Sequence, residues 1–157
     1  MSVLYGQWGR MKAWFQKVKM RAAPTSMQED VQRFGDAVRE RVRLHIVSQD
    51  LPWPPLKHGT ITAKGHSAAY MDTLEYYRSI DVKVSKTAVF SLDMLVGPVG
   101  EHSGSGLSMG LLASYLEYGT EKILARPLWR PVLAEVENMP EFKQLTDLGA
   151  RFGFGIV

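Results

Sequence analysis

Two opposed signals, one that ends a helix and one that begins a helix, lie close together between residues 115 and 131. Tyr115-Leu116-Glu117-Tyr118 has the pattern of the last turn of a short apolar helix, and Gly119 fits the left-handed conformation at which helices end. After a loop, Pro127 and Pro131 flank a Leu-Trp-Arg unit that opens another helix, because proline is well tolerated in a first helical turn. The chain must turn a rigid corner here, which indicates shape and assembly rather than catalysis.

Composition places the rest of the chain in an ordinary globular class. The 157 residues suffice for one domain with a sizeable core. The sequence contains no cysteine, which excludes disulfides, thiolate catalysis and cysteine metal sites and fits a reducing cytosol. No apolar run approaches the roughly 20 residues of a membrane helix. Basic residues interrupt the apolar runs near the N-terminus, so we expect neither a membrane span nor a signal peptide.

The positive charge is concentrated at the N-terminus. Of the 19 lysines and arginines, five fall in residues 1–23, which contain no acidic residue, so the remainder carries 14 basic and 16 acidic side chains. Such a block suits contact with an acidic partner surface or with phosphate, and it equally suits a solvated helix face. The five residues are Arg10, Lys12, Lys17, Lys19 and Arg21.

Three- and four-residue spacing of apolar side chains predicts an amphipathic helix over residues 3–22, which Pro24 ends. Trp8 and Trp14 are larger than one short face usually hides, so we expect this helix to pack on the core or on another subunit. The same aromatic residues, interleaved with lysines, could instead stack on nucleic-acid bases.

A second helix is predicted from Ser26 to about Ser48. Ser26 and Glu29 form a capping box. His45 lies on the apolar stripe and is expected to be packed and hydrogen-bonded rather than a metal ligand. The stripe consists of Met27, Val31, Phe34, Val38, Val42 and His45.

The middle of the chain predicts a loop and then a hairpin. Residues 50–66 contain a Pro-Trp-Pro-Pro run that cannot be a helix or a central strand. We expect an ordered loop with Trp53 held on the core, although a polyproline ligand is an alternative. Residues 60–64 are expected to be a short strand or an extended loop, and residues 70–79 a short helix. Alternating apolar residues predict strands at 80–85 and 88–97, joined as an antiparallel hairpin.

The remaining signals complete an α+β pattern. Residues 98–106 form a loop rich in glycine and serine that we expect to be mobile. Ser108 is placed to cap a helix that ends at Gly119. A last helix should begin near Pro131, and Pro140 should interrupt it or start a new turn. The glycine-broken tail at 149–157 is apolar without helical support and is expected to dock on another surface.

No set of residues predicts catalysis or cofactor binding. The four histidines fall in different segments, and none has metal-ligand spacing to another histidine or a carboxylate. The glycine-serine loop lacks the Gly-Lys-Ser/Thr ending of a phosphate-binding loop and the Gly-x-Ser-x-Gly pattern of a hydrolase. Glu117 could serve as a general acid or base, but it has no second carboxylate near it. We expect no enzyme, no cofactor and no metal.

Four segments, taken in order, resemble the tail-completion and head–tail joining proteins of tailed bacteriophages. Each resembles one family motif: Trp-x-Pro-Leu…Thr…Lys-Gly, Asp-Thr-Gly-x-Leu-x-x-Ser-Ile, aromatic-Glu-aromatic-Gly-Thr, and Ala-x-Pro-Phe-Leu-Arg-Pro. Leu74 and Tyr76 depart from the glycine and leucine of the second motif. The matching segments are Trp53-Pro54-Pro55-Leu56 with Thr60 and Lys64-Gly65, Asp72-Thr73-Leu74-Glu75-Tyr76-Tyr77-Arg78-Ser79-Ile80, Tyr115-Leu116-Glu117-Tyr118-Gly119-Thr120, and Ala125-Arg126-Pro127-Leu128-Trp129-Arg130-Pro131.

The resemblance implies an α+β fold with long N-terminal helices packed on a small antiparallel sheet of about four strands, and a C-terminal helix. It also implies a virion protein that is assembled in the host bacterial cytoplasm and forms a ring, most often a hexamer, at the neck. Its partners would be its own copies, the phage tail tube and the connector, adaptor or stopper proteins, with DNA passing through the lumen without sequence recognition. The expected organisation is a basic N-terminal helix or arm at 1–24, a core domain at 25–139, and a C-terminal helix and aromatic tail at 140–157.

Large aromatic groups, arginines and the corner carboxylate are our candidates for contacts between subunits or layers, because buried aromatics and arginines dominate interface energies. For each of them, burial within its own domain is an equally open interpretation. The alternative function is a small nucleic-acid-binding module that acts through the basic N-terminal helix. The interface candidates are Trp8, Trp14, Trp53, Glu117, Trp129, Arg130, Phe152 and Phe154.

Overall fold

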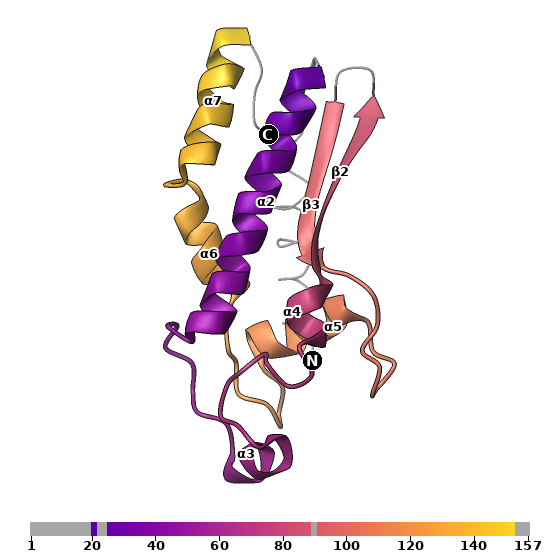
Figure 1. The fold of residues 1–157 in the computed structure, drawn as a ribbon, viewed down its shortest axis with the longest axis vertical. Helices are drawn as coiled ribbons and strands as arrows, with labels where there is room; N and C mark the ends of the chain where they lie inside the picture. Colours follow the sequence, from indigo (N-terminus) through magenta and orange to yellow (C-terminus); the bar gives the residue numbers. More distant parts are fainter. Residues whose placement is uncertain (1–19, 22–24, 89–90, 153–157) are drawn as a thin grey trace. The chain divides into compact units, whose positions relative to one another are not determined.

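The computed structural model describes residues 20–21, 25–88 and 91–152 (Figure 1). The chain divides into two compact units. We call residues 1–39, 82–96 and 133–157 the sheet unit, and residues 40–81 and 97–132 the corner unit. In chain order the elements are β1 (Met20–Arg21), α2 (Thr25–Ser48), α3 (His58–Lys64), α4 (Glu75–Ser79), β2 (Ile80–Ala88), β3 (Ser91–Pro98), α5 (Met109–Tyr118), α6 (Trp129–Val136) and α7 (Pro140–Phe152).

In the sheet unit, the first half of α2 lies between α7 and the β2–β3 hairpin (Figure 1). On one side the ring of Phe34 packs against Phe142, with 5.7 Å between centroids. On the other side α2 approaches the hairpin at Gly35, where a Cβ would lie 2.5 Å from Val82 Cγ1 and 2.9 Å from Met94 Sδ. This close packing of helix on hairpin therefore requires a residue without a side chain.

The corner unit contains the end of α2, the helices α3, α4 and α5, and the start of α6. Arg43 ties α2 to the beginning of β2, because its Nη2 donates to the Ile80 carbonyl at 3.1 Å and its guanidinium lies 5.1 Å from the Tyr77 ring centroid. The buried apolar residues of the corner unit are Val42, Ile46, Ala69, Tyr70, Tyr76, Ile80, Met109, Ala113, Leu128, Trp129 and Val132.

The helix predicted at 26–48 is confirmed as α2. It begins one residue earlier, at Thr25, so Ser26 lies inside the first turn rather than at the cap. All six residues of the predicted stripe are buried. His45 is packed and hydrogen-bonded as predicted, with Nδ1 2.7 Å from Asp50 Oδ1.

Residues 60–64 form neither a strand nor an extended loop, because they belong to the helix α3. The Lys57 carbonyl accepts the first helical hydrogen bonds from Thr60 and Ile61. Gly65, with φ at +76°, ends the helix by donating its N–H to the Ile61 carbonyl. The capping interactions outweigh the preference of β-branched residues for strands. The helix predicted at 70–79 is also shorter, since α4 covers only its second half.

The hairpin is confirmed, and its turn lies later than predicted because β2 continues to Ala88. The predicted alternation in β3 is confirmed by the burial of Leu92, Met94 and Val96. The chain mixes helices with antiparallel sheet, so the α+β class holds, but the expectation of about four strands is wrong. The described residues contain two full strands and the two-residue β1, in the order β1-β3-β2.

The two ends of the chain also depart from expectation. Met20 and Arg21 are a strand, which contradicts the end of the helix predicted at 3–22, while the rest of that prediction lies outside the described residues. Pro140 begins a new helix, α7, as one of the two alternatives predicted. α7 continues to Phe152, so the first part of the tail predicted without helical support is helical.

Candidate functional site

The buried carboxylate of Glu117, at the end of α5, caps the beginning of α6. Its Oε2 accepts hydrogen bonds from the backbone N–H groups of Leu128 at 2.7 Å and Trp129 at 3.0 Å, and its Oε1 accepts from the Arg130 N–H at 3.1 Å. The first N–H groups of a helix have no partner within the helix. A carboxylate also interacts favourably with the positive end of the helix dipole. Glu117 therefore fixes where α6 starts and how it meets α5.

Arg130 closes the same cap from the solvent side. Its Nε donates to Glu117 Oε1 at 3.1 Å, and its Nη2 donates to the Glu117 backbone carbonyl at 3.1 Å. The guanidinium also lies 5.3 Å from the Tyr118 ring centroid. Four hydrogen bonds reach the carboxylate, which has about four acceptor positions. The carboxylate is thus committed to holding the corner and has no acceptor position left for a substrate proton.

Gly119 and Thr120 make the tight turn that follows α5. Gly119 has a φ of +76°, and a Cβ there would lie 2.8 Å from the Ile123 carbonyl oxygen and 2.9 Å from the Ala125 nitrogen. The Thr120 N–H donates to the Ile123 carbonyl, and the Thr120 hydroxyl accepts from the N–H groups of Lys122 and Ile123. Only glycine fits the first position, and the threonine side chain closes the loop behind it.

The proline-rich loop is attached to the corner by Arg126, which is buried. Its Nε donates to the Pro54 carbonyl at 3.0 Å and its Nη2 to the Pro55 carbonyl at 3.1 Å. Trp53 makes the reciprocal bond, since its Nε1 donates to the Pro127 carbonyl at 2.6 Å. The predicted ordered loop with Trp53 held on the core is therefore confirmed, and Trp53 remains half-buried.

Two buried tyrosines join the α4 region to the same corner. The Tyr70 hydroxyl donates to the Arg126 carbonyl, and the Tyr76 hydroxyl accepts from Trp129 Nε1 at 3.0 Å. The rings of Trp53, Tyr70 and Tyr76 form a chain with centroid separations of 5.1 and 5.0 Å. Burial raises the pKa of both tyrosine hydroxyls, so they remain neutral hydrogen-bonding groups.

The structure places the predicted site residues in three groups. Glu117 and Trp129 lie in the interior of the corner, whereas Arg130 has 54% of its side chain exposed. Arg21 lies in β1 and Phe152 ends α7, and neither side chain is among those described. Trp53 holds the proline-rich loop to the corner. The remaining predicted site residues lie outside the described residues, namely Trp8, Trp14, Phe154, Arg10, Lys12, Lys17 and Lys19.

Sequence reasoning missed the roles of Arg126, Tyr70 and Tyr76. The carbonyl groups of Pro54 and Pro55, which have no local donor, are one available signal, because backbone acceptors that become buried need partners. An arginine, with five donors, is the side chain best suited to supply them. Nothing local indicates that the donor would come from a residue about 70 positions later.

The glycine-serine loop contains the second polar cluster of the corner unit. His102 lies between two groups, with Nε2 3.5 Å from Glu75 Oε2 and Nδ1 3.2 Å from the Ser105 hydroxyl. In a serine hydrolase the serine contacts Nε2 and the carboxylate contacts Nδ1, which is the reverse. The Gly106 N–H donates to the His102 carbonyl and so cannot stabilise an oxyanion.

This cluster instead links the loop to α4. The Ser103 N–H donates to Glu75 Oε2 at 3.4 Å, and the Ser103 hydroxyl hydrogen bond lowers the pKa of the Glu75 carboxyl. The His102 N–H donates to the Leu107 carbonyl, which closes the loop on itself. The mobility predicted for this loop stays a prediction.

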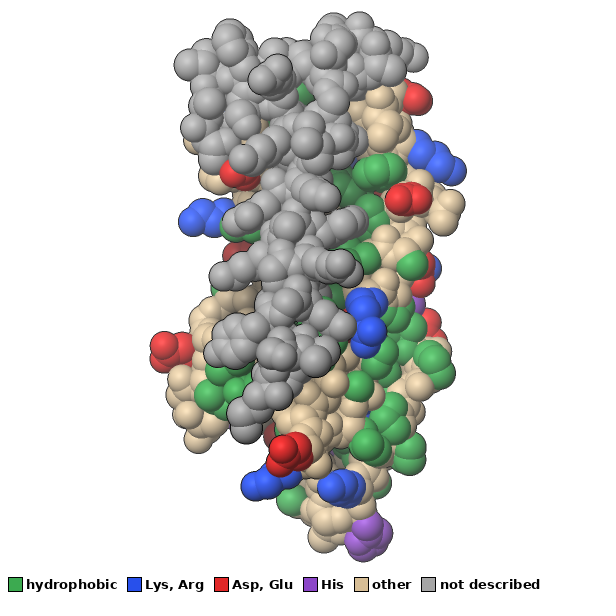
Figure 2. Space-filling model, turned by 180° about the vertical axis from the view of Figure 1, so that it is seen from behind, with side chains coloured by type: hydrophobic (Ala, Val, Ile, Leu, Met, Phe, Trp, Pro, Cys, Tyr) green, Lys and Arg blue, Asp and Glu red, His purple; other side chains and the backbone are tan. Residues whose placement is uncertain are grey.

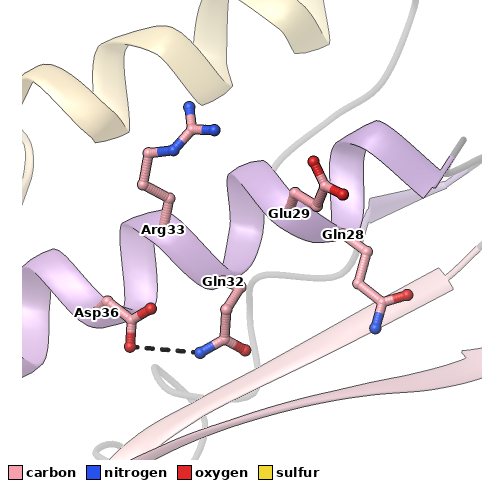
Figure 3. A pocket seen from close by; sticks show the side chains of 5 residues that line it. All are labelled: Gln28, Glu29, Gln32, Arg33 and Asp36. Atoms are coloured by element: carbon pink, nitrogen blue, oxygen red, sulfur yellow. Dashed lines mark hydrogen bonds between the residues drawn. The ribbon is translucent and has the colours of Figure 1, made fainter.

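The sheet unit has a polar hollow of about 550 Å³ along α2 (Figure 3). In Figure 3, Arg33 points toward α7, whereas Gln28 and Gln32 lie on the side of the strands. Gln32 Nε2 donates to Asp36 Oδ1 at 3.4 Å, and Arg33 pairs with Asp30 at 3.1 Å. These groups satisfy one another on an exposed helix face. Throughout residues 20–21, 25–88 and 91–152, no group of three histidine or acidic side chains is arranged to hold a metal ion.

No protein-family model, curated protein or solved structure matches this chain. Within the described part of the chain, no helix is long and apolar enough to cross a membrane.

Proposed function

We propose that this chain is a structural virion protein of a tailed phage, which forms a ring at the neck, completes the tail and joins it to the head connector. One observation carries the proposal: the four segments that resemble the tail-completion and head–tail joining family contact one another in the corner unit. The proline-loop segment reaches the last segment through Trp53 and Pro127. The α4 segment reaches it through Tyr76 and Trp129, and the α5 segment through Glu117.

Short motifs matched by chance have no reason to meet in space. Here, contacts join residues of the four segments that are separated by 74, 53 and 11 positions in the sequence. Trp53, Pro127 and Glu117 match the family motifs, whereas the contact over 53 positions is made by Tyr76 and Trp129, which do not. The resembling segments therefore belong to one hydrogen-bonded structure, the corner, rather than to unrelated parts of the chain. This convergence favours a shared framework with that family.

The chemistry of the corner suits a scaffold. A subunit of a ring must present the same surfaces to each neighbour, which requires a rigid framework between them. Glu117, Arg126 and the two tyrosines direct their polar atoms inward to one another and to the backbone. They stiffen the subunit, and neither Glu117 nor Trp129 reaches the surface to contact a neighbour directly.

Exposed apolar side chains provide surfaces for assembly. Figure 2 shows hydrophobic side chains among charged ones on the face it presents. Large exposed apolar groups commonly mark interaction sites when they gather. Among the described residues, we assign Trp53, Arg130 and the exposed apolar side chains to contacts between subunits or layers. Trp8, Trp14, Phe152 and Phe154 are assigned to such contacts from the sequence. The exposed apolar side chains of the corner unit are Leu44, Val47, Val99, Leu111, Ile123 and Leu124.

The proposed partners follow from the role. The chain assembles with its own copies, with a hexamer favoured, and docks on the tail tube and on the connector, adaptor or stopper proteins. DNA passes through the lumen without sequence recognition. The protein is assembled in the host bacterial cytoplasm and remains in the virion.

The experiment that tests the proposal is co-sedimentation of the purified chain with phage tail tubes and with connector rings. We expect binding by the native chain and loss of binding or of self-association in Leu44→Glu/Val47→Glu, whose positions are 50% and 59% exposed on α2. Gln144→Glu/Thr146→Glu adds two acidic groups at exposed positions of α7 and should behave as the native chain. A chain that binds neither tubes nor connectors, or tight salt-sensitive binding to DNA in their place, would contradict the proposal.

A further inference from the structure

Residues 50–68, which we call the α3 projection, are closed at their base by one side chain. Gln49 Nε2 donates to the Ala69 carbonyl at 3.0 Å, and Gln49 Oε1 accepts from the Ala69 N–H at 2.8 Å. This pair of hydrogen bonds joins the two ends of the segment. Trp53 and Arg126 hold its proline-rich part to the corner. The base of the α3 projection is therefore fixed in place.

The helix at the end of this projection lacks a buried face. None of the seven residues of α3 is buried. In Figure 1, α3 lies apart from α4 and α5 of the same unit. Helices in proteins gain most of their stability by packing an apolar face, so α3 is unusual in being held by its caps and by the fixed base of the projection. Binding residues are often carried by segments that a rigid framework holds out in this way.

The α3 projection carries cationic groups and no carboxylate of its own. Residues 51–71 contain two lysines, two histidines and no acidic residue. Lys57 Nζ donates to the Lys122 carbonyl at 3.3 Å. Lys64 Nζ lies 3.8 Å from Asp72 Oδ2, and the Asp72 side chain is 53% exposed. Such a surface attracts a partner with negative charge. The four groups are Lys57, His58, Lys64 and His66.

Apolar side chains next to these cations favour a protein partner over a nucleic acid. The bond from Lys57 to Lys122 places the projection beside a loop whose Ile123 and Leu124 are 36% and 56% exposed. Glu121 and Lys122 of that loop contribute opposite charges. Binding to nucleic acid depends on neutralising many phosphates, for which two lysines are few. Protein interfaces combine apolar groups with a charged rim, which is the combination found here.

The chain itself contains a stretch of the opposite charge at residues 133–147. This stretch has four acidic residues and one lysine, so its net charge is −3. Glu137 is exposed where α6 gives way to α7, and Glu141 lies in the first turn of α7. Two different surfaces of opposite charge on one chain suit a head-to-tail contact that repeats from copy to copy. The charged residues of the stretch are Glu135, Glu137, Glu141, Lys143 and Asp147.

We propose that the α3 projection of one copy docks on the acidic stretch at residues 133–147 of the next copy in the ring. Lys57 and Lys64 supply the cations, and Glu137 and Glu141 supply the carboxylates. The inference rests on the proposed ring and adds which two surfaces meet in it. Charge pairs of this kind fix the register of a contact and speed association. Because the charges are exposed, the contact weakens as the salt concentration rises.

Charge reversal on either side of the contact tests it. The lysine variant is Lys57→Glu/Lys64→Glu, and the glutamate variant is Glu137→Lys/Glu141→Lys. Each variant alone places like charges opposite one another in a head-to-tail contact. We expect each to raise the apparent dissociation constant of self-association by about tenfold or more, measured by sedimentation velocity of the full chain at low salt.

An equal mixture of the two variants separates a lost contact from a misfolded chain. In the mixture, the reversed projection meets a reversed acidic stretch, and the native projection meets a native one. Alternating copies should therefore associate about as tightly as the native chain. Lys83→Glu/Lys86→Glu reverses two exposed lysines of β2 and is the matched control, which should associate as the native chain does.

The outcomes distinguish this contact from the ring itself. If native chains associate but the lysine variant loses nothing, or the mixture regains nothing, the contact is overturned and the proposed ring stands. If native chains remain monomeric, both are overturned. A lysine variant that keeps self-association but loses affinity for duplex DNA would assign the α3 projection to nucleic acid and would likewise overturn the proposal.

Discussion

The corner unit and the sheet unit are stabilised by different kinds of interaction. The corner unit is held by directional bonds: the side chains of Glu117 and Arg126 together accept or donate six hydrogen bonds that connect different segments of the chain. The sheet unit is held mainly by apolar contact, with α2 pressed against the hairpin at Gly35 and against α7 at Phe34. Directional bonds specify one arrangement of loops, whereas apolar packing tolerates change as long as volume is kept. The corner should therefore be the less tolerant of the two.

The largest effect should come from Glu117→Ala in the corner. The change leaves three backbone N–H groups of α6 and the Arg130 guanidinium without their acceptor. Each buried N–H group left without an acceptor costs about 1–3 kcal/mol in the free energy of unfolding, so losing the acceptor of the Leu128 and Trp129 groups should cost about 2–6 kcal/mol. Urea denaturation at neutral pH measures it. A cost below about 1 kcal/mol, on the scale of an ordinary surface substitution, would show that the cap does not hold the corner.

Arg126→Met should have the next largest effect. Methionine keeps much of the side-chain volume but removes the donors to the Pro54 and Pro55 carbonyl groups. Hydrogen bonds from a charged group contribute about 1.5–3 kcal/mol, so we expect a loss of that order in the free energy of unfolding. Arg33→Met is the matched control, because it removes an exposed pair with Asp30 that should contribute about 0–0.5 kcal/mol. Equal losses in the two variants would contradict the distinction between the buried and exposed arginines.

Gly35→Ala probes apolar packing in the sheet unit, and Gly110→Ala in the corner unit is its control. At Gly35 the new Cβ would lie 2.5 Å from Val82 Cγ1, and valine cannot easily turn away because its χ1 is restricted. Overpacking costs about 1–3 kcal/mol, against a gain of about 1 kcal/mol in helix propensity, so Gly35→Ala should destabilise slightly. At Gly110, in α5, nothing lies within 4 Å of the new Cβ, so Gly110→Ala should be neutral or stabilising. Thermal melts of both variants measure the difference, and stabilisation by Gly35→Ala would disprove the close contact.

The smallest expected effect is a change in the stability of the protein at acidic pH on substitution of Asp50. The hydrogen bond with His45 lowers the pKa of the Asp50 carboxyl below its ordinary value of 3.8. A carboxyl whose pKa is lowered by folding contributes stability that is fully present above its unfolded pKa and is lost as the pH falls through the folded pKa. Asp50→Asn should therefore flatten the acid side of the stability profile, measured as urea midpoints below about pH 5. Asp147→Asn on α7 is the control, and an equal flattening there would contradict the role of the pair.

Local signals explain the parts of the fold that the sequence predicted. The apolar stripe of α2, the Ser108 cap and the glycine that ends α5 each act within a few residues, so they can be read directly from the chain. The hairpin was predicted for the same reason, although its turn was placed too early. Residues 60–64 were missed because helix α3 depends on the Lys57 carbonyl and the Gly65 cap rather than on the preference of its threonines.

The corner could be predicted only in outline. For Glu117 and Trp129 the sequence left contact with other subunits and burial within the domain as equal alternatives, and the structure shows burial. The sequence did not indicate that Glu117 caps a helix. Their roles depend on bonds to residues 11 to 53 positions away, and periodicity carries no information at that range. Arg126 was overlooked for the same reason, because its acceptors lie more than 70 residues earlier in the chain.

The proposed ring is tested most directly by the symmetry of the purified native chain, measured by electron-microscope class averages together with its mass in solution by light scattering. We expect closed rings, with a hexamer favoured, and the same rings at the end of phage tail tubes. A single subunit that stays monomeric at high concentration, and that adds no ring to tail tubes or connectors, would contradict it.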